Sequence, residues 1–247
     1  DMDTIISMGD KALASPELAG EWEGMIGSMQ DLKNFPRFLT EQLFFQYMQG
    51  AMMVQYVKDS GGGWKAVEEL YKKSPRSTEE VLHPYKLIRR DDPPVDVRLA
   101  GVTGELEKRS WEVEDQDVMG ELGIRVLMKI WQDEDARDPQ AAGTAAAGWG
   151  GDRYYYLSNA GSGKDLLVWK TAWDTEQDAR EFAVAYRTML PVRFPKMRKA
   201  WRSDSESPVA FQVWEVEPGR FLKLVMDKKT IGIIDTTDKT MLDIPLN

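Results

Sequence analysis

The hydrophobic pattern of this chain changes character near residue 150. Before that point apolar residues recur at the three- and four-residue spacing of helices, whereas after it they form short strand-like runs separated by turns. The pattern therefore predicts an α+β protein, with a mainly helical N-terminal region over residues 1–149. The β-rich region, residues 150–247, is predicted to form an antiparallel β-sheet with a covering helix.

Several helices are expected in the first region. Apolar residues surround most of segment 37–58, which is typical of a buried central helix, and Gly50 within it suggests close approach by a neighbour. Residues 1–30 are predicted to form two helical pieces. Segments 119–131 and 138–149 are predicted to form an amphipathic helix and an alanine-rich helix that packs closely on its surroundings.

A tight helical corner follows the three glycines at 61–63. Trp64 begins a helix whose apolar residues are spaced to form one buried stripe, and Pro75 ends that helix. Ser77 then starts a capping box in which Glu80 reaches back, and a short helix ends at His83. We predict that this corner has a structural role and not a catalytic or binding one.

The rest of the chain is mostly extended. Residues 85–88 and 91–99 are predicted to be extended or edge-strand segments, because adjacent prolines suit no central strand, and residues 105–117 fit a helix or a strand equally well. A hairpin is predicted from 154–157 and 166–173, followed by a helix over 174–190 with a second capping box. Three further strands joined by tight turns are predicted at 211–216, 220–225 and 230–235.

Composition excludes several classes of function. A chain of 247 residues, 42% of them hydrophobic, can bury a core, and its net charge of −9 opposes sequence-independent binding to nucleic acid. The most apolar stretch, residues 35–57, carries charged and amide side chains, so we predict no membrane span. There is no cysteine and one histidine, which excludes thiol catalysis, disulfides and any metal site with several His or Cys ligands in this chain.

Two motifs invite a functional interpretation that we do not favour. Residues 161–164 have the look of a phosphate-binding loop, but Asp165 stands where the Walker pattern needs Ser or Thr, so we predict a hairpin turn. Acidic groups at Asp91/Asp92, Glu112/Glu114 and 133–135 lack EF-hand spacing, and we predict that they are solvated charge.

Five residues remain as binding candidates: Trp64, His83, Trp149, Asp152 and Arg153. His83 could act as a general base or a lone metal ligand, although a histidine at a helix end more often bonds a nearby carboxylate or backbone group. Glycines around Trp149, beside an Asp-Arg pair at a helix-to-strand crossing, could line a pocket. The alternative, which we favour, is that Asp152 and Arg153 lock the two regions together. We assign no catalytic residue, metal ligand or cofactor to this chain.

Three segments, 61–84, 120–123 and 145–153, are specific as a set in their order and spacing. Together they resemble the C-terminal portion of a little-characterised bacterial family of exported, gluzincin-like zinc metallopeptidases, over roughly residues 37–190. In that family an upstream H-E-x-x-H helix supplies two zinc ligands and a general base. This sequence has no H-E-x-x-H, so no catalytic residue of the family can be carried onto it, and zinc is implied only if an upstream segment supplies that motif.

The resemblance leads to two functional hypotheses. The first is a non-catalytic region of an exported gluzincin-like protein that binds substrate or acts as a scaffold for the missing zinc segment. The second is a stand-alone extracytoplasmic module that holds a ligand or a partner protein or peptide. Both imply a periplasmic or secreted location. Because the first residue is Asp1, we also expect that a leader has been removed or that the chain is a piece of a longer precursor. Hydrolysis by paired carboxylates has no specific support.

Overall fold

A computed structural model describes residues 35–131, 140–198, 202–204 and 210–246. The chain divides into two compact units, Asp1–Ser74 and Pro75–Asn247. The two helical pieces predicted in residues 1–30, and the start of the helix predicted from residue 138, lie outside the described residues. The division by composition into regions 1–149 and 150–247 stays a prediction.

In the first unit, helix α3 (Arg37–Val57) leads through a π-helical turn, η2 (Lys58–Gly62), into helix α4 (Gly63–Leu70). The predicted helix over residues 37–58 is therefore confirmed, but the prediction that it is buried on all sides is wrong. Leu39, Leu43 and Tyr47 are exposed, while Met53 and Val57 are buried. The apolar pattern of α3 marks a helix with an exposed hydrophobic surface.

Two related expectations are also wrong. A Cβ atom added at Gly50 would meet nothing within 4 Å, so this glycine does not serve a close contact. The stripe predicted on α4 is not buried, because Trp64 is 66% exposed and Tyr71 is 91% exposed. Hydrophobic spacing identified the helix correctly but did not show whether a partner covers it.

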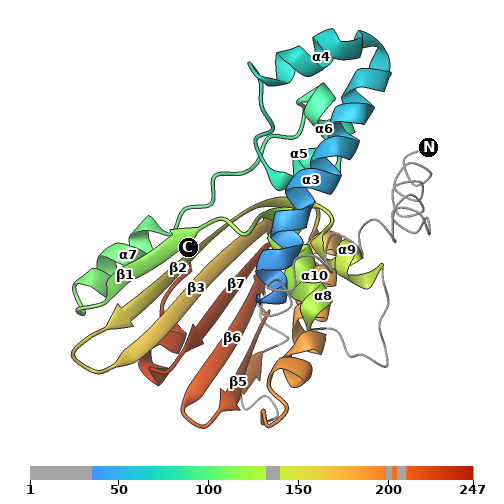
Figure 1. The fold of residues 1–247 in the computed structure, drawn as a ribbon. Helices are drawn as coiled ribbons and strands as arrows, with labels where there is room; N and C mark the ends of the chain where they lie inside the picture. Colours follow the sequence, from blue (N-terminus) through green and yellow to red (C-terminus); the bar gives the residue numbers. More distant parts are fainter. Residues whose placement is uncertain (1–34, 132–139, 199–201, 205–209, 247) are drawn as a thin grey trace. The chain divides into compact units, whose positions relative to one another are not determined.

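The second unit is built on a sheet (Figure 1). The described strands form one seven-stranded sheet in the order β1-β2-β3-β7-β6-β5-β4, and every neighbouring pair is antiparallel. The α+β fold class is thus confirmed. The strands are β1 (Glu112–Asp117), β2 (Trp149–Asn159), β3 (Lys164–Trp173), β4 (Arg202–Asp204), β5 (Ala210–Glu217), β6 (Arg220–Asp227) and β7 (Thr230–Thr236).

Helices cover both faces of this sheet. On one face α10 (Glu176–Arg193), α8 (Gly120–Ile130) and α9 (Ala141–Ala146) enclose a core that includes Trp169, Trp173 and Phe182. On the other face α7 (Ala100–Glu107) and the 3-10 helix η3 (Lys239–Asp243) enclose a second core. The covering helix predicted after β3 is α10, which begins with a capping box at Thr175 and Asp178, one residue later than the sequence pattern suggested.

The ambiguous segments resolve as follows. Residues 105–117 contain the end of α7 and the edge strand β1, so both interpretations hold in part. Residues 91–99 join no strand, and Val95 N donates to Gly150 O at 2.6 Å. The prediction that residues 85–88 are extended is wrong, because they lie in a short helix, Pro84–Arg89, whose first turn Pro84 favours. Residues 161–164 belong to the turn between β2 and β3 and the first residue of β3, as predicted. Among the described helices, none combines the length and the apolar character that a bilayer span requires.

Candidate functional site

The helical corner of the second unit is built by capping interactions. α5 (Thr78–Leu82) begins at Ser77, whose Oγ accepts a hydrogen bond from Glu80 N at 3.3 Å. α6 (Pro84–Arg89) follows at once, because Pro84 is favoured in the first helical turn and cannot continue α5. The predicted capping residue is confirmed, although Glu80 reaches back to the backbone N–H of Arg76, at 2.7 Å, and not to Ser77.

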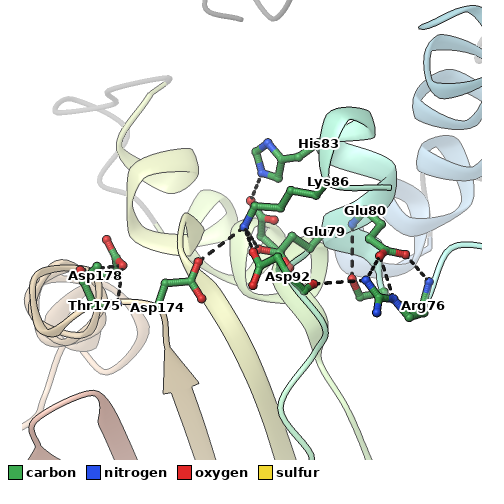
Figure 2. A network of polar contacts seen from close by, with 11 residues as sticks. Arg76, Glu79, Glu80, His83, Lys86, Asp92, Asp174, Thr175 and Asp178 are labelled. Atoms are coloured by element: carbon green, nitrogen blue, oxygen red, sulfur yellow. Dashed lines mark hydrogen bonds and ion pairs between the residues drawn. The ribbon is translucent and has the colours of Figure 1, made fainter. Parts of the chain in front are cut away.

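Lys86 is the centre of a polar cluster that joins four parts of the chain (Figure 2). Its ammonium lies 2.6 Å from Glu79 of α5, 2.5 Å from Asp92 of the extended segment and 3.5 Å from Asp174, which follows β3. The Lys86 side chain is 13% exposed and that of Glu79 is 2% exposed. We call these four residues the Lys86 cluster.

Burial and charge perturb the pKa values in the Lys86 cluster. Burial raises the pKa of Glu79 to about 7, against the opposing effect of its hydrogen bond to Lys86. Burial alone would lower the pKa of Lys86, but hydrogen bonds to Asp92 and Glu79 outweigh it and hold that pKa above its ordinary value. Burial also raises the pKa of Asp174. Glu79 is therefore a carboxyl group that titrates close to neutral pH.

Two further buried carboxylates flank this cluster. Glu80 is fully buried and binds the guanidinium groups of Arg76 and Arg90, at 2.5 and 3.2 Å. Glu121 of α8 is 3% exposed, and its Oε1 lies 2.8 Å from Nε2 of His83. Its Oε2 is buried and has no hydrogen-bond partner among the described residues. The only histidine is thus held by a carboxylate, as the structural interpretation predicted.

Asp152 of β2 anchors the third group of contacts. It is 2% exposed and accepts four hydrogen bonds, from the backbone of Met119 and Gly120 and from the indole N–H groups of Trp149 and Trp169, all at 2.8–2.9 Å. These donors come from the start of α8 and from two strands. Asp152 therefore fixes α8 to the sheet, whereas Arg153, the other residue of the predicted lock, forms no ion pair among the described residues.

Beside Asp152 lies a cleft of about 240 Å³ within the second unit. We call it the Arg76–Arg153 cleft. Its lining residues come from the start of α5, the extended segment, the start of α8 and the start of β2: Arg76, Ser77, Thr78, Pro94, Val95, Asp96, Val97, Val118, Met119, Gly120, Trp149, Asp152 and Arg153. Gly151 keeps the extended segment close, since a Cβ there would lie 2.3 Å from Val95 O.

The five candidate residues therefore have different surroundings. Trp149, Asp152 and Arg153 line the Arg76–Arg153 cleft together, as a shared pocket would require. His83 is bound to Glu121 and does not line it. Trp64 is exposed on α4 of the first unit, with Lys58 Nζ 5.3 Å from the centre of its ring.

The sequence did not reveal the Lys86 cluster. Glu79 was recognised only as part of a capping box, and Asp92 was predicted to be solvated charge, which is wrong because it binds Lys86. Asp174 is separated from Lys86 by 88 residues, and no local pattern links them. The sequence offers one signal for this cluster, the two acidic residues at the start of α5. The helix break between α5 and α6 brings Lys86 back toward them.

The carboxylates of Glu79, Asp92 and Asp174 offer oxygens within 4.8 Å of one another, a spacing that could hold a metal ion. Lys86 places its ammonium against all three, so a cation is already supplied by the chain itself. The donor set therefore fits a lysine-centred cluster better than a metal centre. Such a cluster braces the fold and binds one proton near neutrality at Glu79.

Comparison with family models gives a match over the second unit. The family model for a domain of unknown function, DUF8575, matches residues 108–242, which is more than half of the chain. No curated protein and no solved structure matches, and no link to gluzincins emerges. The matched segment begins just before β1 and ends within η3, so it contains every described strand of the sheet. On this evidence of sequence similarity, the chain belongs to the DUF8575 family.

Proposed function

We propose that this chain is a non-catalytic region of an exported, gluzincin-like protein that binds substrate or acts as a scaffold. One observation carries the proposal: within the second unit, residues 75–84 of the first resembling segment bond residues 120–123, and these bond residues 145–153. Thr78 Oγ1 accepts a hydrogen bond from Leu122 N at 3.3 Å, and His83 binds Glu121. Asp152 in turn accepts from Gly120 N.

In this arrangement the carboxylates of the resembling segments have structural partners within the chain. Glu79, Glu80, Glu121 and Asp152 each bind a cation, a histidine or an N–H group of the chain. A general acid or base must instead present its reacting atom to a substrate. The support for a binding role is that these carboxylates bond neighbouring elements of the chain, while the Arg76–Arg153 cleft lies beside Asp152.

Zinc content and peptidase activity of the purified chain test the proposal. We expect zinc well below one ion per chain after dialysis, and no cleavage of a mixed peptide library. The matched variant is His83→Ala, because His83 is the only imidazole. Stoichiometric zinc bound by this chain alone, or cleavage that disappears in His83→Ala, would contradict a non-catalytic role.

The Arg76–Arg153 cleft favours a second candidate function, that of a stand-alone extracytoplasmic module that binds a ligand or a partner protein. The gene separates the two candidates. An H-E-x-x-H encoded upstream supports the scaffold role, with that segment as the partner, and its absence supports the stand-alone module. Fractionation of source cells tests the location, since an extracytoplasmic protein is expected in the periplasmic extract or the culture medium while a cytoplasmic marker stays inside the cells.

A further inference from the structure

In the Arg76–Arg153 cleft the buried acid is already engaged by the chain, whereas several hydrogen-bond donors are not. Asp152, the buried acid in the lining, accepts four N–H groups. Asp96, the other acid, lies 2.6 Å from Arg98 Nε in an exposed ion pair. The Asp152 carboxylate is therefore not free to receive a donor from a ligand, whereas the Asp96 side chain is 58% exposed and keeps acceptor sites toward solvent.

The cleft keeps several donors. Ser77 Oγ and Thr78 Oγ1 each accept a backbone N–H, from Glu80 and Leu122, so each hydroxyl retains a proton to donate. Within the part of the chain that the structure describes, neither hydroxyl donates to another residue, and Arg153 forms no ion pair. A site with spare donors, whose one buried acid is already saturated, suits a ligand that brings its own acceptors and a negative charge.

An independent observation on the sheet points the same way. Arg153 on β2 lies directly opposite Lys170 on β3. Like charges at directly opposed positions of an antiparallel pair repel each other. Lys170, like Arg153, has no carboxylate partner among the described residues. An anion bound beside Arg153 would relieve this repulsion.

The size and the lining of the cleft restrict the class of ligand further. Pro94, Val95, Val118, Met119 and Trp149 form apolar walls. Its volume of about 240 Å³ lies below the roughly 300–1,000 Å³ of sites for drug-sized molecules. We propose that the Arg76–Arg153 cleft binds a small organic carboxylate with a compact apolar body, whose carboxylate meets Arg153 and the hydroxyls of Ser77 and Thr78. This inference deepens the proposed binding function and rests on it.

Calorimetric titration of the full chain with benzoate and with benzamide tests the inference, because the two probes share shape and differ in charge. We expect benzoate to bind at least about tenfold more tightly than benzamide. Arg153→Gln is expected to weaken benzoate binding by about tenfold or more, and Arg153→Lys by less, because lysine keeps the charge but loses the planar donor pair. The matched control is Arg180→Gln on the exposed side of α10, which should bind benzoate as the wild type does.

A second measurement keeps the inference testable if Arg153→Gln does not fold, because it uses the wild-type chain. Benzoate, but not benzamide, should slow the modification of Arg153 by phenylglyoxal in the wild-type chain, as followed by mass spectrometry. Equal affinity for both probes, unchanged binding by Arg153→Gln, or no binding of either probe at millimolar concentration would each overturn the inference. None of these results affects the zinc and peptidase assays, which decide the non-catalytic role separately.

Discussion

Asp152 shows how much of the local structure can depend on one side chain. Its carboxylate satisfies two backbone N–H groups at the start of α8 and two indole N–H groups. Removal of the carboxylate leaves four donors, three of them buried, without an acceptor, and each unsatisfied group is costly. We expect Asp152→Ala to lower the free energy of unfolding by about 3–5 kcal/mol, measured by chemical denaturation.

The control for this substitution is Asp96→Ala. Asp96 also lines the cleft, but its side chain is 58% exposed and its ion pair with Arg98 lies in solvent. Exposed ion pairs contribute about 0–1 kcal/mol. Equal destabilisation by the two substitutions would show that Asp152 does not anchor α8.

Glu79 should make stability depend on pH. Burial raises its pKa in the folded protein to about 7, above the ordinary value of 4.5. The folded state therefore binds the proton more tightly, so the contribution of Glu79 is complete below pH 4.5 and is lost as pH rises through 7. Relative to Glu79→Gln, the wild type should lose up to about 3 kcal/mol of unfolding free energy between pH 5 and pH 8.

Thermal or urea unfolding of both proteins across that pH range measures this difference. A matched comparison is Glu69→Gln, since Glu69 is exposed on α4 and its pKa is lowered by the hydrogen bond to Lys72. The difference in unfolding free energy between Glu69→Gln and the wild type should stay nearly constant above pH 5. If the difference in unfolding free energy between Glu79→Gln and the wild type were also independent of pH, Glu79 would not titrate near neutral pH.

At the scale of single residues, the sequence indicated contacts between residues that are close along the chain and missed contacts between residues that are far apart along it. The capping role of Ser77 and the structural role of His83 were predictable because short-range spacing encodes both. The Lys86–Asp174 contact was not, because it depends on how α6 and the end of β3 meet in space. The grouping of Trp149, Asp152 and Arg153 was predictable from their closeness along β2, but the acceptor role of Asp152 toward α8 was not.

At the scale of elements, the close approach of the extended segment to β2 depends on Gly151. A Cβ atom at this position would lie 2.3 Å from Val95 O and 3.2 Å from Val95 C. The obstacle is backbone, so Gly151→Ala must displace the segment and weaken the bond from Val95 N to Gly150 O. We expect a loss of about 1–3 kcal/mol in unfolding free energy and an altered Arg76–Arg153 cleft.

Gly143 in α9 offers the opposite case. A Cβ atom there meets nothing within 4 Å, and the residue is inside a helix. Gly143→Ala should therefore stabilise the protein by up to about 1 kcal/mol, because alanine restricts the unfolded chain and favours the helix. If both alanine variants shift the unfolding midpoint in the same direction, the close approach at Gly151 is not the cause.

Element types were predicted better than their burial. Capping signals located α5 and α10 to within a residue, and the alternating pattern located β2, β3, β5, β6 and β7. Apolar spacing, in contrast, overestimated the burial of α3 and α4, whose Leu39, Tyr47 and Trp64 are exposed. Spacing reports which side chains share a face, and only the tertiary structure decides whether that face is covered.

At the scale of the whole molecule, both hydrophobic cores belong to residues of the second unit. A fragment spanning Pro75–Asn247 is therefore expected to fold without the first unit and to unfold in one cooperative transition, as followed by circular dichroism. The fragment 35–74, tested in parallel, should show helical signal but no sharp transition. A broad transition for the larger fragment, or strong binding of a hydrophobic dye, would contradict this expectation.

The order of strands was beyond the reach of sequence reasoning. The hairpin of β2 and β3 and the meander of β5, β6 and β7 were both visible as local patterns. That β7 pairs with β3, and so joins the two into one sheet, depends on contacts such as Trp169 opposite Ile233 that are distant in sequence. The buried isoleucines of β7 fit a strand covered on both faces, and the structure identifies the two covers.

The acidic edge strand β1 has a consequence for behaviour at high concentration. A strand at the end of a sheet exposes backbone groups that a second copy could extend into a fibril. Glu112, Glu114, Asp115 and Asp117 place four carboxylates on this strand, so two copies that approached edge to edge would repel each other. Acidification or concentrated salt weakens that repulsion, and turbidity or light scattering should then reveal intermolecular assembly that begins at β1.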